Sequence, residues 1–157
     1  MDKIDKCILP KNYLLNEKYT VLLFIKQSNN AETYRIKGKD GKLYFLKLFN
    51  YSKIHRSAFD ADNNLLEIEI LKGVKHENIV SYKDSGNLIF EGKKYGFLVL
   101  DFIAGETLAE KMNRESFSVY FDIKQIITDV LNGLHYLHNL PEPIIHNEIT
   151  PQNIMLD

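Results

Sequence analysis

The spacing of apolar residues changes along this chain, and that change limits its fold more than any other feature. The first half holds three strand-like runs: Tyr19 to Ile25 and Leu43 to Phe49 are rich in β-branched, aromatic and leucine residues, and Glu32 to Lys37 is short and mixed. Asp40 and Gly41 separate the last two runs, and this dipeptide predicts a tight hairpin because the turn needs residues that accept positive φ. The chain therefore opens on a predicted antiparallel sheet.

A helical period replaces the strand pattern after residue 60. Apolar residues recur there at helical spacing, namely Leu65, Leu66, Ile68, Ile70, Leu71 and Val74. Asp60 and Asp62 precede all of them, and aspartate is a favoured N-cap because its side chain accepts hydrogen bonds from the first free amides. The pattern predicts one helix after the first three strands.

The second half returns to strands before it becomes helical. Strand-like runs occur at Ile79 to Tyr82 and Tyr95 to Leu100, with a turn predicted at residues 91–94. Helices are predicted at Thr107 to Asn113 and Ser118 to Asn139, and two prolines just beyond the last one end it. The complete order predicts an α+β fold, in which a five-stranded antiparallel sheet with one helix is followed by further helices.

Composition excludes several classes of protein. Of the 157 residues 45% are apolar and 26% are charged, which is typical of a globular protein of about one domain. The net charge is −1 and the basic residues are scattered, which argues against a nucleic-acid-binding surface. Cys7 is the only cysteine, and no apolar run approaches the roughly 20 residues of a membrane span. We expect a cytoplasmic protein that binds neither nucleic acid nor membrane.

Lys47 is the only charged residue in the otherwise apolar run Tyr44 to Phe49. A buried charge costs several kcal/mol unless it is paired, so an exposed strand face is one interpretation. The predicted helix offers another, because Glu67 and Glu69 lie on it among apolar residues. A lysine on a strand paired with a glutamate on a helix is the arrangement that positions a phosphate-binding lysine.

A second group of polar residues lies near the end of the chain, in the loop His146 to Asn153. Glu148 and Asn153 stand five residues apart in it. A carboxylate can accept a proton from a substrate hydroxyl, and an amide oxygen can bind magnesium. A polar surface loop without function is the alternative interpretation of the same pattern.

Taken together, these segments resemble the protein kinase family, and the bacterial Ser/Thr kinases in particular. Ile144 to Asp157 resembles the catalytic loop, whose pattern is His-Arg-Asp-x-Lys-Pro-x-Asn followed by apolar residues. Other matching segments are Leu9 to Tyr19 (the lead-in), Glu67 to Val80 (the mobile helix and the strand after it), Phe97 to Leu108 (the hinge) and Val130 to His138 (the helix before the catalytic loop). The matches run almost end to end, in the family's order.

The resemblance implies a role for each candidate site residue. Lys47 would hold the α- and β-phosphates of ATP, and Glu67, rather than Glu69, would orient Lys47. Glu148 would stand at the place of the catalytic base, and Asn153 would bind the second metal ion. The residues implied around the adenine and the loop are Ile25, Ala31, Phe45, Leu100 as gatekeeper, and Asp101 and Ile103 with their main-chain groups.

The resemblance also implies a division of the chain. Residues 1–18 would be a lead-in, 19–100 a kinase-like N-lobe, 101–105 a hinge, and 106–157 the start of a C-lobe that ends after the catalytic loop. ATP and Mg²⁺ are the expected cofactors of the complete domain.

Several residues depart from the family pattern. The stretch Lys26 to Ala31 takes the place of the glycine-rich loop and has no glycine, although glycines let backbone amides approach phosphates closely. Phe45 takes the place of a small alanine above the adenine, so its ring either fills the nucleotide slot or stacks beside a shifted base. In the catalytic loop Asn147, Glu148 and Thr150 replace arginine, aspartate and lysine, and the glutamate adds about 1.5 Å of reach.

The chain stops at Asp157, before the position of the Asp-Phe-Gly metal site. We therefore expect a fragment of a longer protein that binds ATP weakly or not at all and transfers no phosphate. Three interpretations of the longer protein stay open: a Ser/Thr protein kinase, a pseudokinase that serves as a binding or scaffold module, and a small-molecule kinase of related fold.

The longest predicted helix has apolar residues around most of its circumference. They are Phe121, Ile123, Ile126, Ile127, Val130, Leu131, Leu134 and Leu137. A helix that is apolar all round is suited to burial on several sides, and in the kinase fold large-lobe helices would cover it. We expect residues 118–139 of the fragment to bind a second copy instead, about a two-fold axis or by exchange of the helical segment.

Overall fold

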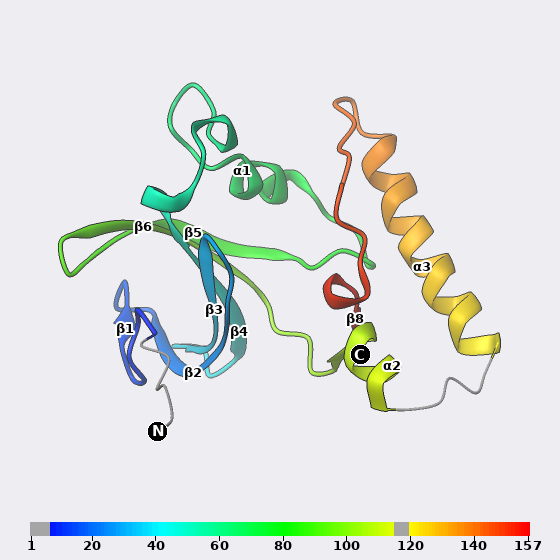
Figure 1. Cartoon of the computed structure of the whole chain (residues 1–157), viewed down its shortest axis with the longest axis horizontal. Helices are drawn as coiled ribbons and strands as arrows, with labels where there is room; N and C mark the ends of the chain where they lie inside the picture. The colour runs from blue at the N-terminus through cyan, green and yellow to red at the C-terminus, as the bar shows by residue number, and fades with distance from the viewer. Residues whose placement is uncertain (1–6, 115–119) are drawn as a thin grey trace. The chain divides into compact units, whose positions relative to one another are not determined.

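The structure is a computed structural model that describes residues 7–114 and 120–157. The chain divides into two compact units. The first comprises the chain up to Gly73 together with Ser81–Phe102, and the second comprises Val74–Val80 together with Ile103–Asp157. The first unit is dominated by a sheet and the second by helices (Figure 1).

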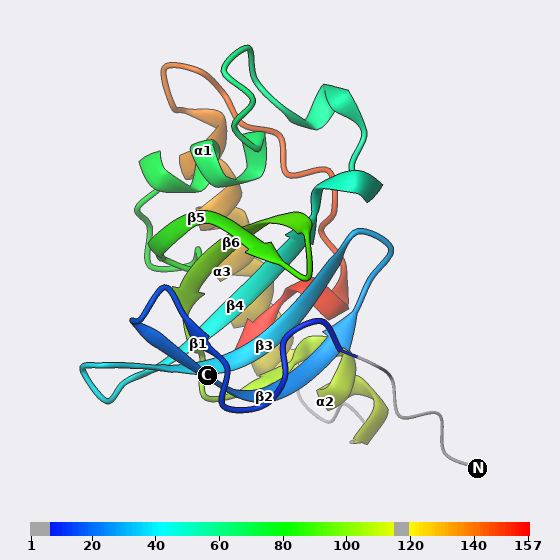
Figure 2. The same cartoon turned by 90° about the vertical axis from the view of Figure 1, so that its left-hand side faces the viewer.

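The sheet of the first unit has six antiparallel strands in the order β1-β2-β3-β4-β6-β5. The strands are β1 (Leu14–Leu15), β2 (Tyr19–Gln27), β3 (Ala31–Gly38), β4 (Leu43–Asn50), β5 (Tyr82–Phe90) and β6 (Lys93–Asp101). Figures 1 and 2 show the sheet with β1 at one side and β5 at the other. The α+β prediction is confirmed, and the two-residue β1 adds a sixth strand to the five predicted.

Two tight turns match their sequence signals. Gly41 has φ +79° in the turn between β3 and β4, and the side chain of Asp40 accepts a hydrogen bond from the amide of Lys42 at 3.0 Å. Glu91 and Gly92 join β5 to β6 with φ +48° and +73°. Both turns therefore use the left-handed region that glycine enters without steric cost.

The predicted strand at Ile79 to Tyr82 is wrong in position. Residues 79–81 form no strand, because the amide of Ile79 donates to the carbonyl oxygen of His76 in a turn at 3.1 Å. Ladder pairing begins only at Tyr82, opposite Leu100 of β6. Ile79 and Val80 belong to the second unit, so their apolar character does not mark a sheet strand.

One face of the sheet carries the core of the first unit. Alternate residues of the central strands point there, so that Leu46 and Leu48 of β4 are fully buried while Lys47 between them points to the other face. The lead-in covers this core with Leu9 and Leu15, which are 1% and 0% exposed. The buried cluster is Leu9, Leu15, Tyr19, Val21, Tyr34, Ile36, Leu46, Leu48, Leu88, Tyr95, Phe97 and Val99.

The predicted helix is present as α1 (Leu66–Gly73), after the short 3-10 turns η1 (Tyr51–Lys53) and η2 (Arg56–Ala58). The predicted N-caps are wrong, however. The side chain of Asp60 accepts hydrogen bonds from the amides of Asp62 and Asn64, at 2.9 and 2.8 Å, and so closes the turn before the helix. An Asx-type turn competes for the same carboxylate that a cap would use.

The second unit contains α2 (Leu108–Arg114), α3 (Tyr120–His138), the 3-10 turn η3 (Pro151–Asn153), and the two-stranded pair β7 (Glu106–Thr107) and β8 (Met155–Leu156). The two predicted helices are confirmed within one or two residues, except that Ser118 and the side chain of Phe121 lie outside the described residues. No helix in the described ranges is both long and apolar enough to cross a membrane.

Local signals explain how α2 begins. The hydroxyl of Thr107 accepts from the amide of Glu110 at 3.2 Å, and the Glu110 carboxylate accepts from the amide of Thr107 at 2.7 Å, which is a capping box. A Cβ on Gly105 would lie 1.7 Å from the carbonyl oxygen of Leu156, so the chain needs glycine where it passes β8.

Candidate functional site

The predicted pair of Lys47 and Glu67 is present in the first unit. Nζ of Lys47, from β4, lies 2.7 Å from Oε1 of Glu67, from α1. The pleat of β4 places Lys47 on the face opposite Leu46 and Leu48, so its side chain meets the helix rather than the core. Glu69, the other candidate, instead pairs with Lys72 on its own helix at 2.7 Å.

Phe45 and Leu100 lie on the same face as Lys47, close to its strand. Directly paired residues of an antiparallel sheet share a face, and Phe45 pairs with Leu100 on one side and Arg35 on the other. Leu100 is buried and Phe45 is half-buried. The neighbouring Asp101 is half-buried and binds Nζ of Lys83 at 2.8 Å. The phenyl ring of Phe45 therefore lies on the part of this sheet face that the resemblance assigns to the adenine.

The loop between β2 and β3 is closed upon itself by Ser28. Its amide donates to the carbonyl oxygen of Ala31 at 2.8 Å, and its hydroxyl accepts from the amide of Ala31 at 3.2 Å. The carbonyl oxygen of Asn30 accepts from the amide of Asn50 at 2.9 Å, which ties the loop to the end of β4. Two of the amides that a glycine-rich loop would offer to phosphates are thus used inside the loop.

The catalytic-loop candidates lie in the second unit and are held together by one hydrogen bond. Nδ2 of Asn153 donates to the main-chain oxygen of Glu148 at 3.0 Å, which leaves the Asn153 amide oxygen for a cation. The amide of Glu148 donates to Nδ1 of His146 at 3.3 Å. Asn147 has φ +62°, a conformation that asparagine tolerates better than the arginine of the family pattern.

The remaining predicted residues differ in their exposure. Ile25 on β2 is 42% exposed, whereas Ala31 at the start of β3 is 5% exposed. Ile103 is half-buried and belongs to the second unit.

Comparison with known proteins agrees with these motifs. Residues 21–157 match the protein kinase domain. This chain belongs to the protein kinase family. It is 30% identical over 148 residues to calcium-dependent protein kinase 4 of Plasmodium berghei (strain Anka), an alignment that covers 93% of this chain and 26% of that protein.

Two further kinases show a similar level of identity. The calcium-dependent protein kinase 4 of Plasmodium falciparum (isolate 3D7) is 28% identical over 148 residues, again 93% of this chain and 26% of that protein. The probable serine/threonine-protein kinase fhkC of Dictyostelium discoideum is 28% identical over 121 residues, 77% of this chain and 19% of that protein. This kinase-family chain thus spans about a quarter, or less, of the length of these relatives.

Kinases of this family generally use ATP and Mg²⁺, and the residues of this chain fit those groups in part. The Lys47–Glu67 pair and the Asn153 amide oxygen have the chemistry to contact phosphate and magnesium. The loop closed by Ser28 does not offer its amides in the way that a glycine-rich loop does.

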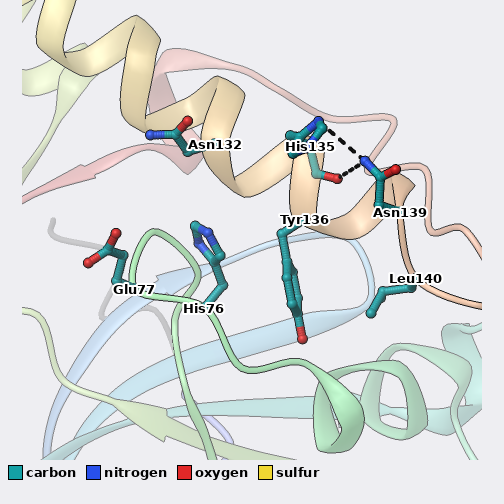
Figure 3. A pocket seen from close by; sticks show the side chains of 7 residues that line it. All are labelled: His76, Glu77, Asn132, His135, Tyr136, Asn139 and Leu140. Atoms are coloured by element: carbon teal, nitrogen blue, oxygen red, sulfur yellow. Dashed lines mark hydrogen bonds between the residues drawn. The ribbon is translucent and has the colours of Figure 1, made fainter.

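Two hollows lie in the described part of this kinase-family chain, and sequence reasoning missed the first of them. One, in the second unit, is lined by His76, Glu77, Asn132, His135, Tyr136, Asn139 and Leu140 (Figure 3). No candidate site residue lines it, and the described residues contain no group of three histidine, cysteine, aspartate or glutamate side chains that could hold a metal. The other hollow, in the first unit, is lined by residues 24–29, which include the predicted Ile25 and part of the predicted loop. Lys53 also lines it, and no sequence signal singled out that residue.

Proposed function

We propose that this chain is the nucleotide-binding part of a cytoplasmic Ser/Thr protein-kinase-like domain, and that the 157-residue chain itself binds ATP weakly and transfers no phosphate. One observation carries the proposal: Nζ of Lys47 lies 2.7 Å from the carboxylate of Glu67. A carboxylate that holds the ammonium group fixes its direction, which a lysine needs in order to grip phosphates. The complete protein would transfer the γ-phosphate of ATP to protein hydroxyls.

The roles of the other residues follow from their chemistry. ATP would supply the phosphoryl group when it is bound, and the Asn153 amide oxygen has the chemistry to hold a magnesium ion. The Glu148 carboxylate would orient the acceptor hydroxyl and take its proton. Because its side chain is one methylene longer than aspartate, this step is expected to be slower than in a kinase with aspartate there.

A second candidate function is a pseudokinase-type binding or scaffold module without phosphotransfer. The closed loop of residues 28–31 favours it, because amides that bond within the loop do not bind phosphate. The half-buried Phe45 also favours a scaffold module, because its ring lies on the part of the sheet face that the resemblance assigns to the adenine.

Replacing Phe45 with alanine should raise the affinity of the chain for MgATP at least tenfold. The ring lies on the Lys47 face between Arg35 and Leu100, where it competes with the adenine for space. Isothermal titration of the wild type and the variant measures the change. Leu43→Ala is a matched control, because Leu43 is an apolar residue at an exposed position on the same face of β4. An unchanged or lower affinity in a folded Phe45→Ala chain would show that the ring is not the obstacle, and saturable low-micromolar binding by the wild type would overturn the weak affinity.

Replacing Lys47 with methionine should lower MgATP affinity in the Phe45→Ala chain at least tenfold, since methionine keeps the length of the side chain without its charge. Lys72→Met is the matched control: it also removes a 2.7 Å ion pair with a glutamate of α1, but that pair lies within the helix. The same titration compares the two. Equal affinities in the two variants would contradict the nucleotide-binding role, and a Phe45→Ala chain that binds no MgATP at millimolar concentration would favour the scaffold module.

A further inference from the structure

The hollow of the first unit lies on the hairpin that takes the place of the phosphate-binding loop. It is lined by six consecutive residues at the end of β2 and its turn, 24–29, and by Lys53 from η1. The lining contains the polar side chains of Gln27, Ser28 and Asn29 and two lysines, but no aspartate or glutamate. Its side chains therefore carry a net charge of about +2 at neutral pH.

Lys26 and Lys53, the two lysines of this hollow, differ from several other lysines of the same unit in having no acidic partner in the part of the chain that the structure describes. Lys18, Lys47, Lys72 and Lys83 each form an ion pair with an aspartate or glutamate. Within the described residues Lys26 and Lys53 have no such partner, although they line one hollow. Like charges that share a hollow without a counter-ion repel each other, and an anion placed between them relieves that repulsion.

The strand register relates this hollow to Lys47. Lys26 of β2 pairs with Thr33 of β3, and Thr33 pairs with Lys47 of β4. Paired residues share a face, so Lys26 points to the face of the sheet that carries Lys47. A bulge at Ile25 brings this about, because the register shifts between Phe24 and Lys26. Two strand spacings separate the backbones of Lys26 and Lys47, which is about 10 Å.

The closed loop explains why side chains would be needed here. The amides of Ser28 and Ala31 bond inside the loop and are not presented to a ligand. A lysine ammonium is a compact charge that binds phosphate without requiring backbone amides. Lysine at the position of the first loop glycine, and a second lysine from η1, place two such charges next to the same loop.

We propose that Lys26 and Lys53 form an anion site for the β- and γ-phosphates of a nucleoside triphosphate, and that this site replaces the amide contacts of a glycine-rich loop. The inference rests on the proposed nucleotide-binding function and deepens it. Lys47 binds one end of the triphosphate, and the Lys26–Lys53 site neutralises the charge at the other end.

Inorganic tripolyphosphate tests the site without the adenine slot, so Phe45 does not interfere. We expect the full chain to bind tripolyphosphate in isothermal titration at low salt, and the Lys26→Met/Lys53→Met double variant to bind it at least tenfold more weakly. The matched control is Lys37→Met/Lys39→Met, which removes two exposed lysines at the other end of the same β-hairpin. Affinity should also fall with added salt, since both lysines are exposed.

The outcomes separate the two proposals. Equal tripolyphosphate affinity in the double variant and the control, or no binding by the wild type at millimolar concentration, overturns the anion site. In the Phe45→Ala chain, the double variant should weaken binding of ATP more than binding of AMP, and equal losses would also overturn it. If tripolyphosphate binding needs Lys26 and Lys53 but the Phe45→Ala chain binds ATP no better than tripolyphosphate, the anion site is supported and the adenine-binding part of the proposed function is contradicted.

Discussion

Replacing Glu32 with alanine should lower the free energy of unfolding by about 3 kcal/mol. Glu32 is only 2% exposed, although it lies directly after the closed loop. Its carboxylate accepts hydrogen bonds from the amide of Ile8, at 2.8 Å, and from the hydroxyl of Tyr34. Alanine would leave the buried Tyr34 hydroxyl and the partly buried Ile8 amide without this acceptor, and each unsatisfied buried donor costs about 1–3 kcal/mol. Urea unfolding followed by far-ultraviolet circular dichroism measures the loss.

Glu32→Gln is the matched control, because glutamine keeps the shape of the side chain and an oxygen that accepts the same hydrogen bonds. We expect it to retain most of the stability that alanine loses. The hydroxyl of Tyr34 also accepts from the amide of Leu9 at 3.0 Å, so the carboxylate holds the lead-in to the sheet at two points. Burial and the neighbouring Glu32 carboxylate raise the pKa of Tyr34 well above its ordinary value, which keeps this hydroxyl a donor. A loss below about 1 kcal/mol in Glu32→Ala would mean that water replaces the missing oxygen.

The parts of the fold that the sequence predicts well are those in which local period and turn chemistry agree with the tertiary structure. The Asp40-Gly41 turn and the alternation of β4 are examples, since both follow from backbone geometry within a few residues. The apolar run around Lys47 made it conspicuous, and the cost of an unpaired charge indicated a partner on the helix, whereas the choice of Glu67 over Glu69 came from the resemblance.

The elements that sequence reasoning missed depend on contacts between distant segments. β1 is two residues long, so it shows no period, and only its ladder with Tyr19 and Thr20 defines it. The burial of Glu32 depends on Ile8, which lies 24 residues away, and glutamate by itself predicts exposure. The strand predicted at Ile79 and Val80 was wrong for the opposite reason. Two adjacent apolar residues resemble a strand whether or not a neighbouring strand pairs with them.

The candidate site shows the same division. Spacing in the chain brought Glu148 and Asn153 into one loop, and the structure adds the hydrogen bond that orients the amide. The closure of the loop by Ser28 was not predictable from its lack of glycine, since a serine side chain can bond within a turn or point away. The gathering of Lys26 and Lys53 in one hollow depends on how η1 folds back, and residues 26 and 53 are too far apart in sequence to suggest it.

The helix α3 leaves an apolar stripe uncovered in this chain. Ile123, Ile127 and Leu131 are 41%, 52% and 57% exposed, and residues four apart on a helix lie on one face. The equal spacing makes the stripe self-complementary: about a two-fold axis at Ile127, two antiparallel copies place Ile123 of each against Leu131 of the other. We therefore expect the chain to form a dimer through the described part of the predicted segment 118–139.

Leu131→Glu should convert that dimer to a monomer, because it would bury two unpaired carboxylates in one interface, each at a cost of several kcal/mol. Sedimentation velocity of the wild type and the variant at about 10 to 100 µM measures the change, because a dimer with a micromolar Kd is largely assembled over this range. Asn132→Glu is the matched control, because Asn132 is exposed but lies about 100° around the helix from Leu131. It adds the same charge outside the stripe and should leave the dimer intact. A wild-type chain that sediments as a monomer throughout this range would contradict the prediction, and so would dissociation by Asn132→Glu as complete as that by Leu131→Glu, since charge alone would then be the cause.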